Sequence, residues 1–535
     1  RYDVAATANN TQRNWIVQGR GSRLVFESLQ AINGGTNYGN RLTIEAHSGG
    51  HIDLAAVTQI ADGAEGNTAR RGISILAQDT GSTIDLRSLT SFQDRATVAD
   101  DAPSYSDLVA RDGGSIRLDS LTTLDGVAIV VDALSDVPLE TVSRFDHGRL
   151  QVSDRSVALP ALTSASETFF TADNGFIDSD ALTTLTGGGL ELRSGGRINT
   201  TLLATIDGTS VRVADGITLS LPLVTSYSHA STDNDQARTL VASGLGSRLE
   251  FPNLTQIDGG THFRSSLSVD ARDGGAIDLA RASQISEPDT GNTSGRGVHV
   301  TADGPGSVID LSSLTTFTDI GESPVSHGAA SGHSSLTVTR GGTIAAPALT
   351  TTTGVHIAAD EGSDFSFELI VDATDSILQA AGSGTLSFAS LASAAGTAIQ
   401  IDGHAASLPT LTDLSAGSLF VQGGGTADAP RLVNIDSATL IASDGMTLSL
   451  PAVTSIKHET TAPNQSATLR AEGFGSRLDL SAVTSIQNGD DYNSRVFVEA
   501  LSGAVVDLSS VQTIEDPDVG NASQRRIELL GEGIG

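Results

Sequence analysis

GSTIDLRSLTSF, residues Gly81–Phe92, is the stretch that this chain repeats most clearly. Ile84 and Leu86 are two positions apart, and Leu89 and Phe92 follow after steps of three. The period of two predicts a short strand with one buried face, and the steps of three predict a corner that keeps both side chains inside. Such a fragment has one apolar edge and is unstable alone, but copies of it can stack. The search for repeats therefore decides the fold.

The same apolar pattern recurs twenty times along the 535 residues when Ile84 is taken as the marker position. The residue five positions after the marker is apolar in all twenty copies, and a glycine precedes the marker by two or three positions in eighteen. A second alternating strand comes before the marker strand, as in Leu42–Ala46 and Val298–Ala302, and glycines turn the chain between them. The markers are Leu24, Ile52, Ile84, Ile116, Val137, Val157, Ile177, Ile198, Leu219, Leu249, Ile277, Ile309, Ile344, Phe365, Leu386, Ala406, Ala427, Leu448, Leu478 and Val506.

Each repeat reads as strand, glycine turn, strand, corner, short strand and loop. This order predicts an all-β fold, a single-stranded parallel β-helix (β-solenoid) whose apolar positions form columns in a narrow interior. The coils form nine-coil super-repeats, because the succession of long and short coils that begins at Leu24 begins again at Leu249 and at Leu478. The predicted hand is right-handed, since the short coils are longer than the coils of left-handed hexapeptide solenoids.

One continuous solenoid of about twenty coils is predicted, in three segments. Residues 1–225 hold the end of one super-repeat boundary and the first nine-coil super-repeat, residues 226–455 hold the second, and residues 456–535 start a third that is truncated. The sequence starts and stops inside coils without a polar cap, and bare ends template edge-to-edge pairing. We therefore expect covalent continuation of the same repeat, or subunits that associate end to end.

The composition excludes several classes of protein. A net charge of −32 repels nucleic acid and anionic membrane surfaces. Apolar residues come in short bursts, and no run approaches the length of a membrane span. The absence of cysteine excludes disulfides, thiolate metal sites and a cysteine nucleophile.

The repeat pattern resembles the β-helical repeat regions of giant bacterial extracellular and surface proteins: haemagglutinin-type adhesins, autotransporter passengers and extracellular fibre proteins. The resemblance covers the whole chain and concerns its architecture rather than a diagnostic motif. It implies a bacterial, extracellular or cell-surface location. It also implies a structural role as a stiff shaft of a surface fibre, matrix filament or adhesin, with other cell-surface or matrix components as partners.

The alternative function is that of a pectate-lyase-like β-helix, which binds or degrades polysaccharide. General acid–base catalysis needs groups that converge in one cleft. Here the acidic residues recur along the chain, aromatic residues make up only 4%, and the 11 histidines are scattered. The sequence therefore predicts no enzyme and no catalytic residue, and no cofactor is expected except for a calcium alternative.

Two positions of the repeat are expected to point outward and to form columns of like residues along the solenoid, and each column has a possible function. The position after the marker is acidic in nine coils, which fits either calcium between coils or a solvated face that prevents lateral sticking; the solvated face is favoured. The sixth position after the marker is threonine in twelve coils. An ice-binding surface needs a broader array, so this ladder is interpreted as structural.

The loop that follows the second coil of each super-repeat occurs three times, each time with clustered acidic residues followed by arginine. Carboxylate oxygens in such a loop are the ligands that calcium prefers, although the spacing differs from an EF-hand. A self-contained turn with an internal Asp–Arg pair explains the same residues and is favoured. The calcium candidates are Asp62, Glu65, Glu287, Asp289, Glu515, Asp516 and Asp518.

Aromatic residues occupy equivalent positions in a neighbouring loop of each copy: Tyr38, Phe263 and Tyr492. Two interpretations stay open. These side chains either contact a partner, or they pack over the side of the shaft.

Overall fold

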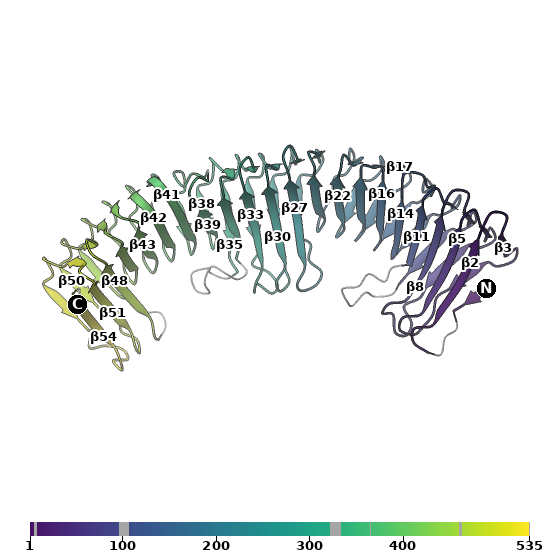
Figure 1. Ribbon diagram of the computed structural model, residues 1–535. Coiled ribbons are helices and arrows are strands. Elements are labelled where there is room, and N and C mark those ends of the chain that lie inside the picture. The colour runs from purple at the N-terminus through teal and green to yellow at the C-terminus, as the bar shows by residue number, and fades with distance from the viewer. Residues whose placement is uncertain (5–7, 96–105, 322–332, 364, 460–462, 534–535) are drawn as a thin grey trace. The chain divides into compact units, whose positions relative to one another are not determined.

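A computed structural model describes the whole chain except residues 5–7, 96–105, 322–332, 364, 460–462 and 534–535. The described residues contain no helix, and their paired strands run parallel. The fold is a parallel β-solenoid, as predicted (Figure 1). Contacts divide it into two compact units, Arg1–Tyr227 with Arg238–Asn253, and Ser228–Ala237 with Leu254–Gly535. Each unit is described by itself.

The first unit contains three kinds of sheet, one for each strand of the repeat. The long strands that precede the markers are β2 (Gln12–Gln18), β5 (Arg41–His47), β8 (Gly72–Gln78), β11 (Ser106–Arg111), β14 (Val127–Val131), β16 (Arg149–Ser153), β19 (Phe169–Asp173), β22 (Gly189–Arg193), β24 (Ser210–Ala214) and β27 (Ala237–Ser243). The marker strands are β3 (Arg23–Val25), β6 (His51–Asp53), β9 (Thr83–Asp85), β12 (Ser115–Arg117), β17 (Ser156–Ala158), β20 (Phe176–Asp178), β23 (Arg197–Ile198), β25 (Thr218–Ser220) and β28 (Arg248–Glu250). The strands after the corner are β1 (Tyr2–Asp3), β4 (Ala31–Asn33), β7 (Gln59–Asp62), β10 (Ser91–Asp94), β13 (Thr123–Asp125), β15 (Arg144–Asp146), β18 (Ser164–Ser166) and β21 (Thr184–Thr186), while β26 (Ser226–Ser228) lies where the chain passes between units.

The second unit repeats this plan. Its long strands are β30 (Ser266–Arg272), β33 (Gly297–Asp303), β36 (Ser335–Thr339), β39 (His356–Ala359), β41 (Ile377–Ser387), β42 (Ala398–Ser407), β43 (Ser418–Gln422), β45 (Thr439–Ser443), β48 (Ser466–Glu472), β51 (Arg495–Leu501) and β54 (Arg526–Gly531); β41 and β42 also include the marker. The other marker strands are β31 (Ala276–Asp278), β34 (Val308–Asp310), β37 (Thr343–Ala345), β44 (Gly425–Asp428), β46 (Met446–Ser449), β49 (Arg477–Asp479) and β52 (Val505–Asp507). The strands after the corner are β29 (Gln256–Asp258), β32 (Gln284–Glu287), β35 (Thr316–Asp319), β38 (Thr351–Thr353), β40 (Asp372–Thr374), β47 (Ser455–Lys457), β50 (Ser485–Gln487) and β53 (Thr513–Glu515).

The strand register pairs marker with marker. In the first unit Ile84 is the Cα partner of both Ile52 and Ile116, although a full coil of sequence separates it from each. In the second unit Leu448 pairs with Ala427 across a short coil and with Leu478 across a long one. A slip of one residue would turn every apolar side chain to the outer surface, so burial of one face fixes the register.

Apolar columns fill the interior, as the repeat predicts. Ile84, Leu86, Leu89 and Phe92 are all fully buried, and the same four positions are buried in the following coil. Each side chain packs against its counterparts one coil before and one coil after. Burial of an aliphatic side chain of this size contributes about 1.5–3 kcal/mol, so every added coil stabilises its neighbours.

The corner between the marker strand and the next strand is a hydrogen-bonded turn. The Leu89 N–H donates to the Leu86 carbonyl at 2.9 Å, and Leu314 and Leu311 repeat this contact at 2.8 Å. The turn explains the steps of three in the sequence, because it brings two successive apolar residues to the same interior.

The acidic column next to the markers caps these corners. Asp310 Oδ1 accepts a hydrogen bond from the backbone N–H of Ser312 at 2.9 Å, and Asp278 makes the same contact with Ala280 at 3.0 Å. Short acidic side chains commonly hold turns in this way. Neither the calcium interpretation nor the solvated-face interpretation anticipated this role. Asp85 also differs from the expected outward exposure: it is only 2% exposed because Arg87 and Arg117 lie against it.

Removing one corner cap is expected to loosen that corner locally. Asp310→Ala should lower the local opening free energy by about 1 kcal/mol, the usual contribution of one such hydrogen bond. Asp310→Asn keeps the Oδ1 acceptor and should have little effect. Hydrogen exchange at the Ser312 amide measures the difference, and equal protection in both variants would contradict the capping role.

The threonine column is structural, as predicted. Thr90 Oγ1 donates to the Thr58 carbonyl at 2.9 Å, and Thr122 Oγ1 donates to the Thr90 carbonyl at 3.1 Å. Each hydroxyl therefore links its coil to the preceding coil. These bonds add side-chain links to the backbone ladder.

Candidate functional site

The long loops stack on one another and continue the order of the coils. In the second unit the Asn292 N–H donates to the Thr261 carbonyl at 3.1 Å, and the Asp235 N–H donates to the Phe263 carbonyl at 2.8 Å. The equivalent loops of the first unit are joined by the Asn67 N–H and the Thr36 carbonyl at 3.0 Å. We call each such set a loop stack; the three stacks lie within residues 8–72, 231–297 and 463–526.

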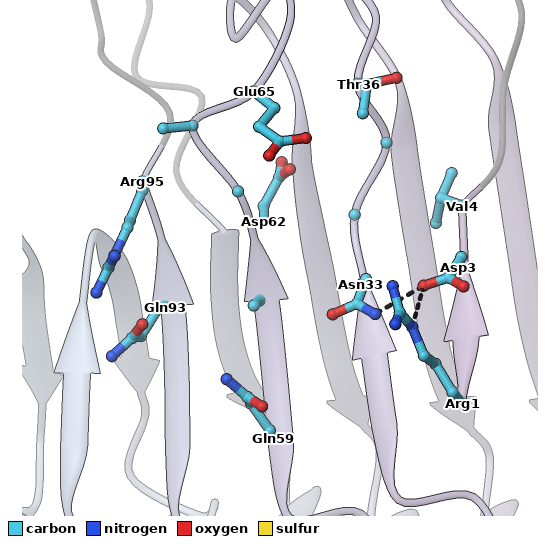
Figure 2. Close-up of a pocket in the computed structure, with 15 residues that line it drawn as sticks. Arg1, Asp3, Val4, Asn33, Thr36, Gln59, Asp62, Glu65, Gln93 and Arg95 are labelled. Atoms are coloured by element: carbon cyan, nitrogen blue, oxygen red, sulfur yellow. Dashed lines mark hydrogen bonds and ion pairs between the residues drawn. The ribbon is translucent and has the colours of Figure 1, made fainter.

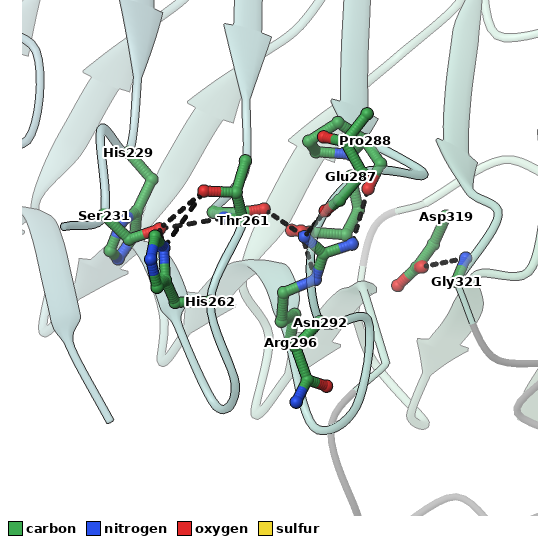
Figure 3. A network of polar contacts seen from close by, with 12 residues as sticks. His229, Ser231, Thr261, His262, Glu287, Pro288, Asn292, Arg296, Asp319 and Gly321 are labelled. Carbon is green, nitrogen blue, oxygen red and sulfur yellow. Dashed lines mark hydrogen bonds and ion pairs between the residues drawn. The ribbon is translucent and has the colours of Figure 1, made fainter. Parts of the chain in front are cut away.

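A buried ion pair lies at the base of the loop stack in the second unit (Figure 3). Arg296 Nε is 3.2 Å from Glu287 Oε1, and both side chains are almost fully buried. Arg296 Nη1 also donates to the carbonyls of Gly260 at 2.6 Å and Thr290 at 2.8 Å, and Nη2 donates to the Pro288 carbonyl at 2.5 Å. One arginine therefore ties together two consecutive loops of the stack.

The first unit repeats this arrangement. Arg71 Nη2 is 3.3 Å from Asp62 Oδ1, and both side chains are fully buried. Arg71 Nη1 donates to the carbonyls of Gly35 and Glu65, each at 2.7 Å. The third copy pairs Arg525 Nε with Asp516 Oδ1 at 3.6 Å. The acid–arginine turn that the sequence favours is thus an arginine-centred contact, with both side chains buried in the first two copies and the acid 40% exposed in the third.

The buried acid at the base of the first and second stacks requires an open position in the preceding coil, whereas in the third stack Asn488 occupies that position and donates a hydrogen bond to Asp516. A Cβ atom on Gly259 would lie 1.8 Å from Glu287 Oε2, and a Cβ on Gly34 would lie 2.4 Å from Asp62 Oδ1. Glycine at these two positions makes room for the carboxylate. The pairing of glycine with acid one coil later is therefore a steric requirement of the site.

Burial perturbs the ionisation of these acids. Desolvation, reinforced by the Asp94 carboxylate, raises the pKa of Asp62 to about 7 in spite of Arg71. Desolvation likewise raises the pKa of Glu287 to about 8, against the lowering effect of Arg296 and with Asp319 adding to the rise. A second carboxylate thus acts on the buried acid in each of these two stacks, and the pair binds a proton more readily than a single acid would.

Acidic residues with a shifted pKa are frequent in active sites, but a substrate must be able to reach them. The side chain of Asp62 has no exposed surface and that of Glu287 is 1% exposed. A substrate atom cannot reach either carboxylate without displacement of the loop. The geometry supports a role in holding the loop stack together rather than proton transfer to a ligand.

The calcium candidates do not converge in the described residues. Asp62 and Glu287 face arginine, and Asp516 lies beside Arg525. Glu65, Asp289, Glu515 and Asp518 are exposed to solvent. The described residues contain no group of three His, Cys, Asp or Glu side chains that could hold a metal ion. Calcium binding stays a prediction, and chelation should lower the melting temperature if it occurs.

The three loop aromatics occupy equivalent places and are all partly buried. The Phe263 ring lies 4.8 Å from Arg264 Cζ, and the Tyr38 ring lies 5.8 Å from Arg70 Cζ. These are cation–π distances. The Tyr492 carbonyl accepts a hydrogen bond from the Asn464 N–H at 3.0 Å. Contact with a partner stays a prediction for all three.

A wide hollow opens beside the first loop stack (Figure 2). Its volume is about 850 Å³, and it is lined by residues of β1, β4, β7 and β10 and of the loops that follow these strands. Asp3 Oδ1 accepts hydrogen bonds from Arg1 Nε at 2.8 Å and from Asn33 Nδ2 at 2.7 Å on one wall, while Gln93 and Arg95 line the other. The hollow offers amides and charges of both signs.

Acidification is expected to act on the second unit in two opposite ways, through its buried histidines and through its buried acids. Burial lowers the pKa of His299 and His356 from 6.5, and the neighbouring His333 acts in the same direction. A folded pKa below the unfolded value means that this stabilisation is present above about pH 6.5 and is lost as the pH falls. The buried acids act in the opposite direction, because their folded pKa is raised above the unfolded value. The stabilisation from Glu287 is present at low pH and is lost as the pH rises to its folded pKa of about 8.

A double variant isolates the histidine effect. Lowering the pH from about 7.5 to about 5 should change the melting temperature of His299→Gln/His356→Gln more favourably than that of the parent protein, because the buried acids are common to both. Equal changes in the two proteins would show that these histidines do not contribute.

A second hollow, which no feature named from the sequence predicted, lies on the outer face of β41, β42 and β43. Its lining includes Gln379, Gln400 and Phe420. The available signal was their spacing, because each of these residues follows the previous one by a single short coil. The part of the chain that the structure describes holds no helix suited to spanning a membrane. No family model, curated protein or solved structure matches this chain.

Proposed function

We propose that this chain is a stiff β-solenoid shaft of a bacterial extracellular fibre, matrix filament or adhesin. The observation that carries the proposal is the in-register pairing of each marker with the marker of the next coil, as in Ile52, Ile84 and Ile116. Backbone ladders, apolar columns and threonine hydroxyls all run between neighbouring coils. Bending or stretching such a stack disturbs several sets of contacts at once, which favours stiffness.

Solubility of the shaft is supported by its charge. The net charge of −32 and the acidic outer positions oppose lateral association between copies. We infer self-association end to end, or continuation of the same repeat, rather than side-to-side bundling. A loop stack recurs at the start of every nine-coil super-repeat, so the stacks provide repeated positions for surface or matrix partners.

Electron microscopy of the purified chain tests the shaft proposal. Elongated rods of uniform width are expected, and at a strand spacing of about 4.8 Å a nine-coil super-repeat rises about 43 Å. Filaments with that axial feature would support end-to-end assembly, whereas dispersed rods would support a monomeric shaft. Collapsed or freely bent particles would contradict the proposal. Protease treatment of intact source cells, followed by detection with an antibody, tests the surface location.

A further inference from the structure

The outer face of the short coils carries a hollow with the composition of a ligand site. Its volume is about 340 Å³, and it lies over β41, β42 and β43, in the stretch of coils without long loops (Figure 1). The side chains that line it are Gln379, Ala381, Gln400, Asp402, Phe420 and Gln422. The site is independent of the loop stacks.

The strand register sets the positions of these side chains. Gln379, Gln400 and Phe420 are Cα partners on three consecutive coils, so they stand side by side at about 4.8 Å. Asp402 and Gln422 form a second row two residues further along the same strands. Ala381 stands in that second row beside Asp402, and its small side chain leaves the space open.

The groups available in the hollow belong to side chains. The backbone groups of β42 are hydrogen-bonded to β41 on one side and to β43 on the other, so an extended peptide cannot add to this face as a strand. The side chains of Gln379, Asp402 and Gln422 are exposed, and Phe420 is partly exposed. His356 Nε2 lies 3.3 Å from Gln379 Oε1 and holds this amide from the preceding coil.

An aromatic surface beside amides and a carboxylate suits a polyhydroxylated ring. The apolar face of a pyranose packs on an aromatic ring, while its hydroxyl groups need partners that both donate and accept. Glutamine amides do both, and Asp402 accepts from two hydroxyl groups. The residues in the hollow include no cation, and the chain carries a net charge of −32, so an anionic ligand is disfavoured.

From this arrangement we propose that the hollow over β41–β43 binds uncharged polysaccharide, with Phe420 as the stacking surface and Gln379, Gln400, Asp402 and Gln422 as hydroxyl partners. The proposal adds a lateral binding site to the chain and does not depend on its being a shaft.

Affinity electrophoresis tests this site in native gels that contain a soluble β-glucan, a galactomannan, a xylan or, as the acidic comparison, polygalacturonate. At least one neutral polymer should retard the protein. Phe420→Ala should weaken that retardation about tenfold, as expected for an aromatic contact at the centre of a site. Gln400→Ala should weaken it about fivefold through lost hydrogen bonds.

The matched control is Phe169→Ala on β19, which removes an aromatic side chain that is 39% exposed on the long-strand face of the first unit. It should bind like the parent protein. If Phe420→Ala does not fold, Gln400→Ala and Gln422→Ala carry the test. No retardation in any neutral polymer, retardation only in polygalacturonate, or equal effects of Phe420→Ala and Phe169→Ala would overturn the proposal. Rods in electron micrographs are expected in all of these cases, so the two proposals fail separately.

Discussion

Above about pH 8, replacing Arg296 with methionine is expected to destabilise the loop stack of the second unit by about 3–5 kcal/mol, the usual effect of removing one partner from a buried ion pair. The guanidinium lies against Glu287 and binds three loop carbonyls, so its loss leaves unpaired carbonyl groups and, where Glu287 is ionised, an uncompensated buried charge. Hydrogen exchange across residues 258–297 should report the opening of both tied loops. Limited proteolysis at the same loops is an independent measure.

The acid partner gives this prediction a pH dependence. A protonated Glu287 needs no counter-charge, and desolvation already raises its pKa to about 8. The destabilisation by Arg296→Met should therefore be larger above about pH 8 than near about pH 5. The double variant Glu287→Gln/Arg296→Met removes the uncompensated charge and should recover part of the loss.

The matched control is Arg264→Met in the same loop stack. Its side chain is 66% exposed, and an exposed arginine contributes at most about 1 kcal/mol. Equal exchange rates in Arg296→Met and Arg264→Met would show that the buried arginine does not hold the loops.

Truncating Phe170 to alanine should destabilise the short coils of the first unit by about 3–5 kcal/mol. Phe170 is 1% exposed and stands in a column between Leu150 and Leu190, its Cα partners on the adjacent coils. Its ring also meets the Phe145 ring edge-on, with centroids 6.1 Å apart. Alanine would leave a cavity that three coils cannot close, because the backbone ladder fixes their spacing.

The neighbouring Phe169 supplies the control, since it lies on the same strand and points outward. Phe169→Ala should change stability by less than about 1 kcal/mol. Denaturant midpoints compare the two variants, and hydrogen exchange of residues 149–193 locates the effect. A larger effect of Phe169→Ala than of Phe170→Ala would reverse the assigned faces of the strand.

The core could be predicted from sequence because one short-range rule governs it. Apolar side chains at Ile84, Leu86, Leu89 and Phe92 must all enter one interior, and only one register satisfies every coil. The register therefore followed from the marker positions alone. The right-handed sense of the solenoid stays a prediction.

The polar positions of the repeat were harder to interpret, because the sequence pattern does not show which group each polar side chain bonds to. The sequence allows Asp310 to be a cation ligand or, as favoured, a solvated charge, and neither interpretation includes the hydrogen bond from the Ser312 N–H that the corner brings to its carboxylate. The sequence shows that Arg296 follows an acidic loop, but it does not show that the arginine is buried. Gln400 and Phe420 come together only when the short coils stack, so the hollow emerges from register rather than motif.

Register is the property on which every other inference rests, and cysteine pairs measure it directly because the chain contains no cysteine. Ser164 and Thr184 are Cα partners on the outer face of adjacent coils, whereas Thr186 lies two residues further along. Parallel neighbours about 4.8 Å apart fall within disulfide range, and an offset of two residues exceeds the limit of about 7 Å. Mild oxidation should therefore cross-link Ser164→Cys/Thr184→Cys and leave Ser164→Cys/Thr186→Cys open. Preferential cross-linking of the second pair would contradict the in-register solenoid.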